Sequence, residues 1–519
     1  MKYIKYKKSL LIVAALVSTF SFTSCKKGWL DVNDNPNDPT DANITPELIF
    51  VAGANGAGVR QASGNWRFVN EWVGYLSAAG DFAIVQDETT YNIDFSFGNA
   101  IWANQYNVLF DLHQAKVKAL AKGDSVLAGA SMILSAKLFQ ELVDVYGNIP
   151  YTQAFAGNAN RTPAYDDAKT IYTDLQKVLD TAIRYVSGTA KLNFNSYIGA
   201  VIRIGNEQLG GDKNTIPGKQ AHWVKFANTL KLRLLIRQSE TAGFNPAAEI
   251  AKISVGGVLN ILRQGETVSV NPGYVNEDNK QNPFYGVYGF TPTGGDANTS
   301  TRANQYIVTK LNSTGDPRLK RYFATVGSSV VGTTFGLAVG NPGGAASSKF
   351  GPGLLGDGSE GPSQDQWIMP SFESLFFEAE AIARGWVTGN AKTAYENAVT
   401  ESFVWLGVAD AAAEAADYLT NPSADWANAG ATPLAKAKFI AYQKYLSLAG
   451  IDPLEAWSDI RRLNMMPDNG YISVNPGRLG GNKIPNRLLY PQTEYTTNST
   501  NVKAQGDIDQ FTTKIFWQP

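Results

Sequence analysis

Cysteine and histidine supply many of the nucleophiles, general bases and zinc ligands of proteins, and this chain of 519 residues has one cysteine and two histidines. Cys25 has no second cysteine with which to form a disulfide within the chain. His113 falls on an apolar helical stripe and is expected to pack in the interior, and His222 adjoins Trp223 without a visible catalytic partner. A Ser-His-Asp triad and a Cys/His zinc site are therefore disfavoured, and we expect no cofactor.

Carboxylates are plentiful, so a pair that hydrolyses a glycosidic bond stays an alternative. Glu373, Glu380 and Arg384 fall opposite the apolar stripe of one predicted helix, a pattern typical of a solvent-facing surface. The string Gly351–Gly356 (GPGLLG) lacks the strand-turn-helix context of a dinucleotide-binding loop. The balance of 45 basic and 46 acidic residues is not that of a nucleic-acid-binding protein. We therefore predict no nucleic-acid partner, and a glycosidase is the catalytic alternative that these residues leave open.

The position of Cys25 indicates a different role. Four lysines precede Leu10–Phe20, an apolar run of 11 residues. A membrane-spanning helix needs about 20 apolar residues, so this run is typical of a secretory signal and not of an anchor. It leads to Phe22–Cys25 (FTSC), which resembles a bacterial lipobox. We predict a signal peptide over residues 1–24 and lipidation of Cys25, where each buried CH₂ would contribute about 0.8 kcal/mol to membrane attachment. An ordinary signal peptide with an incidental cysteine is the alternative.

Helical periodicity predicts a mostly α fold built from tetratricopeptide-repeat-like helix hairpins in a superhelical scaffold. The hairpins are expected at about residues 100–240 and 370–465, with breaks at Gly123-Asp124 and Gly389-Asn390. Between them, residues 255–365 are rich in loops, and Val326–Pro362 has 11 glycines in 37 residues. We predict that residues 25–45 form an irregular tether and that residues 46–519 form a single domain.

Two segments combine aromatic rings with amides and carboxylates outside clean helical periodicity. Flat rings suit the apolar faces of sugars, and the polar groups suit their hydroxyls. The segments are residues 65–91 and 273–290. A buried core position is the alternative for each aromatic residue. The candidate ligand-binding residues are Trp66, Trp72, Tyr75, Asp81, Tyr91, Asn282, Tyr285 and Tyr288.

Several motifs in order along the chain resemble the SusD/RagB family of outer-membrane lipoproteins, in its SusD-like second branch. They include Tyr146–Tyr151 (YGNIPY), Trp223–Arg237, Gly315–Leu319 (GDPRL), Met369–Trp386 and Trp457–Leu463 (WSDIRRL). The resemblance implies a SusD-like helical scaffold with a loop-rich portion that binds ligand, and no catalysis. It also implies a partner, a TonB-dependent (SusC-like) outer-membrane transporter, and an oligosaccharide or peptide ligand.

The resulting hypothesis is a lipoprotein of the outer membrane that faces the cell exterior, contacts the membrane through its N-terminal lipid alone and captures an oligosaccharide for import. Exposure at the cell surface rests on the resemblance, because Lys26-Lys27 follow the cysteine where surface-exported lipoproteins often have acidic residues. The alternatives are a peptide-binding member of the same family, a lipid-anchored helical glycosidase, and a structural surface protein without a small ligand.

Overall fold

The computed structural model describes residues 44–62, 66–188, 201–204 and 216–519. The predicted signal peptide, Cys25 and most of the predicted tether therefore lie outside the described residues. Pro46–Pro519 forms one compact unit, and the description below concerns that unit.

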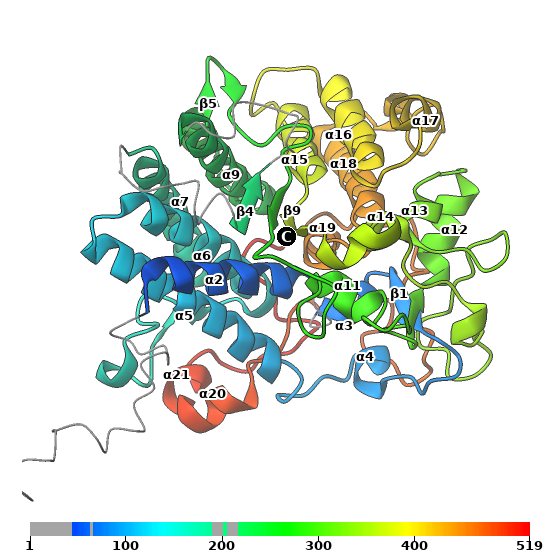
Figure 1. The fold of residues 1–519 in the computed structure, drawn as a ribbon, viewed down its shortest axis with the longest axis horizontal. Coiled ribbons are helices and arrows are strands. Elements are labelled where there is room, and N and C mark those ends of the chain that lie inside the picture. Colours follow the sequence, from blue (N-terminus) through cyan, green and yellow to red (C-terminus); the bar gives the residue numbers. More distant parts are fainter. Residues whose placement is uncertain (1–43, 63–65, 189–200, 205–215) are drawn as a thin grey trace, which may run out of the picture. The chain divides into compact units, whose positions relative to one another are not determined.

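Among the described residues, the first helical half contains five long helices that pack side by side (Figure 1). Helices α5 and α6 form the hairpin that the sequence predicts, and α7 packs against α6 and α9. The short strands β2 (Ile149–Pro150) and β3 (Tyr165–Asp166) pair between α6 and α7. The helices are α2 (Pro46–Ala62), α5 (Asn99–Ala121), α6 (Ser125–Tyr146), α7 (Ala168–Val186) and α9 (Ile216–Arg237).

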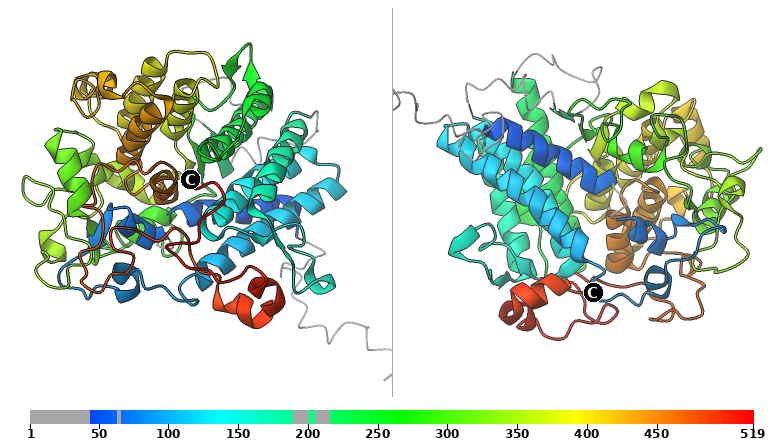
Figure 2. Two further views of the ribbon diagram at one scale, coloured as in Figure 1. Left: turned by 180° about the vertical axis from the view of Figure 1, so that it is seen from behind. Right: turned by 60° about the horizontal axis from the view of Figure 1, so that its bottom comes forward.

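The second helical half repeats the hairpin arrangement, with α15 packed against α16 and α18 (Figure 1). The short helices α20 and α21 follow it and lie beside the first half (Figure 2). The prediction of a mostly helical fold with a hairpin scaffold is thus confirmed. The helices are α15 (Ser371–Ala383), α16 (Ala391–Trp405), α17 (Ala411–Tyr418), α18 (Pro433–Ser447), α19 (Pro453–Leu463), α20 (Gln492–Thr497) and α21 (Ser499–Lys503).

Turn and cap residues lie at the helix ends that the sequence predicts. Gly123 has φ +77°, a left-handed conformation that suits glycine, and it ends the turn between α5 and α6. The Asp124 side chain then accepts a hydrogen bond from Leu127 N at 3.0 Å and caps α6. Asn390 caps α16 in the same way, through Thr393 N at 3.3 Å. The positions of the hairpins can therefore be predicted from turn and cap residues in the sequence.

The loop-rich remainder contains short helices and strands. Strands β4 (Ile202–Ile204), β7 (Val268–Val270) and β9 (Gln366–Met369) form an antiparallel sheet in the order β4-β7-β9. Strand β1 (Leu76–Ala78) pairs with β8 (Thr301–Ala303), and β5 (Ser254–Val255) pairs with β6 (Val258–Leu259). The short helices are α3 (Arg67–Trp72), α4 (Gln86–Thr90), α10 (Ala247–Lys252), α11 (Pro283–Tyr288), α12 (Gln305–Ser313), α13 (Leu319–Tyr322) and α14 (Pro352–Leu355).

A buried network of charged side chains joins the two helical halves. Glu455 on α19 accepts hydrogen bonds from Arg237 and Arg233 on α9 and from Lys444 on α18. Buried charges are tolerated when they are paired in this way. The network continues through further ion pairs, whose members include Asp144, Asp459, Arg462, Glu380, Arg384 and Glu240.

This network corrects one expectation from the sequence. Glu373 and Glu380 on α15 were expected to face solvent, and both are buried. Glu380 pairs with Arg462 at 2.6 Å and with Arg384 at 2.7 Å. The face opposite the apolar stripe of α15 is polar because it packs against other charged helices, and not because it meets water.

Helix α6 is long and apolar enough to cross a membrane, yet most of it is buried within the fold, as for the core helix of a globular domain. Within the described part of the chain, no group of three or more His, Cys, Asp or Glu side chains is placed to hold a metal ion.

Candidate functional site

The aromatic residues proposed in the first segment lie in the interior. Trp72, Tyr75 and Tyr91 are fully buried, and Trp66 is nearly so. Trp72 packs edge-on against Trp457 at 5.9 Å between ring centroids, and its Nε1 donates to the carbonyl of Glu88 at 3.0 Å. These rings leave no face for a sugar, because other parts of the fold cover them.

Tyr75 and Tyr91 are held by hydrogen bonds that explain their burial. The Tyr75 hydroxyl donates to the carbonyl of Tyr445 at 2.6 Å, and the two rings stack at 4.8 Å. The Tyr91 hydroxyl accepts from Ser473 N at 2.9 Å. Buried tyrosines usually find such a partner, so their role in the structure is to anchor the segment that carries Asp81.

The proposed residues of the second segment are also covered. The Asn282 side chain caps α11 by accepting from Tyr285 N at 2.9 Å. Tyr285 is 8% exposed and lies against Gly361, where an added Cβ would be 2.4 Å from its ring. Tyr288 packs against Phe284 and Phe350 with centroid distances of 5.0 and 5.1 Å. Sequence reasoning could not see this burial, because the covering residues are distant along the chain.

Asp81 is the exposed member of the proposed set. Its two carboxylate oxygens each lie 3.0 Å from Gly344 N, which donates to them. Gly80 N donates to the carbonyl of Pro342 at 2.9 Å, and an added Cβ at Gly80 would be 1.9 Å from Asn341 O. Residues 79–87 and 336–349 therefore touch closely, and only glycine fits at position 80.

Residues 290–302 form a third segment beside these two. It is joined to them by the pairing of β1 with β8, in which Ala78 pairs with Thr301 and Ser77 with Arg302. Arg302 Nε donates to the carbonyl of Gly344 at 3.0 Å. Burial lowers the pKa of Arg302, and the negative charges of Asp296 and Asp81 oppose that effect. We call the surface formed by residues 79–87, 290–302 and 336–349 the loop face.

The loop face presents apolar and polar groups together. Phe82, directly after Asp81, is 41% exposed, and Val85 and Val339 are exposed as well. Lys349 Nζ lies 4.2 Å from the centroid of the Phe290 ring and pairs with Asp296 at 2.5 Å. Exposed rings beside fixed charges and amides are the groups that bind sugars or peptides. Sequence reasoning proposed Asp81 and missed Phe82, because nothing local distinguishes an exposed ring from a buried one.

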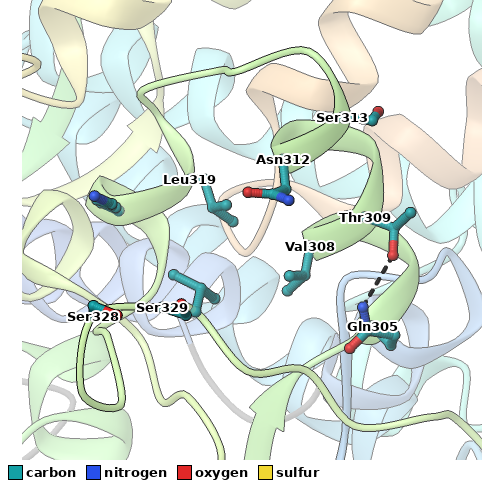
Figure 3. Close-up of a pocket in the computed structure, with 10 residues that line it drawn as sticks. Gln305, Val308, Thr309, Asn312, Ser313, Leu319, Ser328 and Ser329 are labelled. Atoms are coloured by element: carbon teal, nitrogen blue, oxygen red, sulfur yellow. Dashed lines mark hydrogen bonds between the residues drawn. The ribbon is translucent and has the colours of Figure 1, made fainter.

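The structure also has cavities that no loop-face residue lines. One of about 400 Å³ lies along α12, where Gln305, Thr309 and Asn312 face Ser328 and Ser329 (Figure 3). Its lining is polar and aliphatic, and Gln305 donates to Thr309 at 3.0 Å. Two more cavities, of about 320 and 350 Å³, share Phe155 as a wall beside α5.

His113 lines the smaller of the two cavities beside Phe155. Burial lowers its pKa, and the charge of Lys116 lowers it further. His222 lies 3.6 Å from Glu266, and burial lowers its pKa against the opposing effect of that carboxylate. Neither histidine adjoins the loop face, so neither serves as a base there.

Comparison with known proteins gives the family. A SusD-like family model, described as "Starch-binding associating with outer membrane", matches residues 42–491. The chain belongs to the SusD-like family. The match spans the helical halves and the loop face, so it covers most of the compact unit. A search of curated proteins finds no match.

Solved SusD-like structures share the fold of this chain. A chitin-binding SusD homolog from Flavobacterium johnsoniae is 23% identical, with a TM-score of 0.70 over 90% of this chain and 98% of that one. A SusD homolog from Bacteroides fragilis is 21% identical, with a TM-score of 0.68 over 92% and 99%. A SusD-like protein from Bacteroides thetaiotaomicron is 22% identical, with a TM-score of 0.69 over 90% and 98%. At these identities the likeness establishes the SusD-like fold.

Proposed function

We propose that this SusD-like protein is a non-catalytic lipoprotein of the outer membrane that captures an oligosaccharide at its loop face and delivers it to a TonB-dependent transporter. The observation that carries the proposal is the family match over residues 42–491. The chitin-binding homolog supports a glycan as the ligand. Cys25 would hold the lipid that keeps the protein on the membrane.

The loop face supports the binding part of the proposal. Phe82 offers an exposed ring for the apolar side of a sugar, and Asp81 is held in place by Gly344 N. The carboxylate of Asp81 is not enclosed by protein, so it can accept hydrogen bonds from sugar hydroxyls. Trp72, Tyr75 and Tyr91, on either side of the segment that carries Asp81, are fully buried and hold its two ends in the fold. A segment held at both ends has less entropy to lose on binding.

Three of the carboxylates that a glycosidase could use are buried, whereas Asp81 and Asp87 are exposed on the loop face. Glu373 and Glu380 are buried within the helical scaffold, where substrate cannot reach them. Glu88 is buried and pairs with Arg67 at 2.6 Å. A glycosidase needs two carboxyl groups on either side of a bound sugar, and these three are not available for that role.

The test measures binding and hydrolysis in the same samples. Purified protein is titrated by calorimetry with oligosaccharides of starch, chitin and other glycans, and the mixtures are then analysed for shorter products. We expect saturable binding of at least one glycan without cleavage. Phe82→Ala should weaken that binding by about 1–3 kcal/mol. Phe95→Ala, which removes a ring of similar exposure outside the loop face, is the matched control.

Three results would contradict the proposal. Hydrolysis products would indicate a glycosidase. Binding of peptides but of no glycan would favour the peptide-binding alternative, and the absence of any saturable ligand would favour a structural surface protein.

A second experiment tests the proposed partner. Extraction of the membrane in mild detergent should yield the protein together with a TonB-dependent transporter. Recovery of the protein without a transporter would argue against delivery.

A further inference from the structure

A groove of about 350 Å³ beside α5 combines aromatic walls with one carboxylate. We call it the aromatic groove, and it is formed by Trp102, Tyr106, Phe110, Phe155, Pro163 and Glu494 among others. Helix α5 supplies three of the rings at a spacing of one helical turn. Helix α20 supplies the carboxylate from beneath this half of the molecule (Figure 1).

The rings of the aromatic groove are held in fixed positions. The Trp102 and Tyr106 centroids are 5.0 Å apart, and Phe155 lies 6.2 Å from Tyr106 and 5.9 Å from Phe110. The Tyr106 hydroxyl donates to the carbonyl of Pro150 at 2.6 Å. Phe155 has φ +66°, a conformation that is unfavourable for a bulky residue and that places its ring opposite α5.

Glu494 gives the groove its charge. Its Oε2 accepts from the Tyr165 hydroxyl at 2.7 Å and from Asn498 Nδ2 at 3.2 Å, which fixes the carboxylate in place. No described residue donates a hydrogen bond to its Oε1. Burial raises the pKa of Tyr106 well above its usual value, and the nearby charges of Glu494 and Asp166 raise it further. The carboxylate of Glu494 therefore places a negative charge beside the rings of the groove.

No lysine, arginine or histidine is among the described residues that line the groove. Arg487 lies over the ring of Tyr490, is buried, and donates to the carbonyl of Tyr146. The carboxylate is therefore paired within the protein by neutral donors, and its charge is available to a ligand.

We propose that the aromatic groove binds an organic ammonium group, such as the protonated amine of an amino sugar or a quaternary ammonium. Aromatic faces attract cations through their quadrupole, and a carboxylate adds direct charge attraction. A neutral sugar could stack on the same rings, but it would gain nothing from the charge of Glu494. An anion would be repelled by it.

The test uses a pair of probes of the same shape. Choline carries a fixed positive charge, and 3,3-dimethyl-1-butanol is its neutral isostere. Titration of the purified protein, followed by calorimetry or by ligand NMR, should show choline binding at least about ten-fold tighter than the isostere. For the same reason, glucosamine should bind more tightly than N-acetylglucosamine.

Substitutions then locate the site. Glu494→Gln keeps an oxygen that can accept from Tyr165, and it should weaken choline binding about ten-fold while leaving the isostere unchanged. Glu414→Gln removes an exposed carboxylate from α17 and should change neither. Phe110→Ala should weaken both probes, because the 44% exposed ring forms a wall of the groove. Phe82→Ala, on the loop face, should change neither.

Equal affinity for choline and its isostere in the native protein would overturn the proposal. So would choline binding that neither Glu494→Gln nor Phe110→Ala affects. If Glu494→Gln fails to fold, the ratio of the two probes on the native protein and the effect of Phe110→Ala still decide the question. Glycan capture at the loop face is tested with other ligands and with Phe82→Ala, so the two proposals can fail separately.

Discussion

Arg237 Nη2 donates to Glu455 Oε2 at 2.6 Å, and this ion pair joins helix α9 of the first half to α19 of the second. Both side chains are buried. Arg233 Nε also donates to Oε2 at 3.0 Å, and Lys444 Nζ donates to Oε1 at 2.7 Å. The Glu455 carboxylate thus accepts hydrogen bonds from three cationic side chains. We therefore expect the contact between the halves to depend on Glu455.

Glu455→Gln should lower the free energy of unfolding by about 3–5 kcal/mol, because it leaves buried cations without their partner. Urea denaturation followed by circular dichroism measures the change. Glu277→Gln is the control, since Glu277 pairs with Lys280 on an exposed surface and should cost less than about 1 kcal/mol. A loss for Glu455→Gln as small as that of the control would contradict this account of the interface.

The same carboxylate predicts the response of the protein to acid. Burial would raise the pKa of Glu455, but Arg237, Lys444 and Arg233 outweigh that effect and hold it well below the usual 4.5. Because the folded pKa is depressed, the stabilisation is complete above the unfolded value and is lost as the pH falls through the folded one. Native protein should therefore lose stability below about pH 4.5, and Glu455→Gln should lose less over that range.

For Glu373 we expect the opposite dependence of stability on pH. Burial raises its pKa to about 8, although Arg233 acts to lower it, and neither carboxylate oxygen has a hydrogen-bond partner in the described structure. The folded protein then holds a proton that the unfolded chain releases above its usual pKa of 4.5. Stability should fall as the pH rises from about 5 to 8, by up to about 1.4 kcal/mol per pH unit from this group.

Glu373→Gln isolates that contribution, since the amide has the shape of the protonated acid and does not titrate. The difference in unfolding free energy between Glu373→Gln and the native protein should increase in favour of the variant between pH 6 and 9. A difference that stays constant over this range would show that Glu373 is ionised in the folded protein.

The scaffold could be predicted from the sequence, whereas the accessible side chains could not. Hairpins have local signals at their ends, such as Gly123, Asp124 and Asn390. Burial depends instead on contacts between distant parts of the chain. Trp72 and Phe82 look alike in the sequence, yet Trp72 is covered by Trp457 and Phe82 is exposed.

Helix α5 illustrates the same limit. Its sequence has apolar residues on more than one face, so periodicity could not identify the buried one. The structure buries Leu109 and Leu112 and leaves Phe110 and Val117 exposed. The exposed ring of Phe110, a wall of the aromatic groove, could therefore not be distinguished in the sequence from the buried residues of the same helix.

Trp72→Ala tests the interpretation of the buried aromatic residues. The substitution removes a fully buried ring that contacts Phe68, Tyr91 and Trp457, and it should lower the free energy of unfolding by about 3–5 kcal/mol. Phe82→Ala, at an exposed position, should change it by less than about 0.5 kcal/mol. If Trp72→Ala kept native stability and lost glycan binding, Trp72 would have to contact the ligand.

Cys25→Ser tests the proposed membrane anchor. If Cys25 carries acyl chains, each buried CH₂ contributes about 0.8 kcal/mol, so several chains hold the protein firmly and their loss should release it. The native protein should sediment with the outer membrane, and Cys25→Ser should appear in the soluble fraction. Ser24→Ala keeps the cysteine and a small residue before it, and it should stay on the membrane. Mass spectrometry of the N-terminal peptide identifies the modification directly. An unmodified Cys25 in a membrane-bound protein would show that another segment provides the attachment.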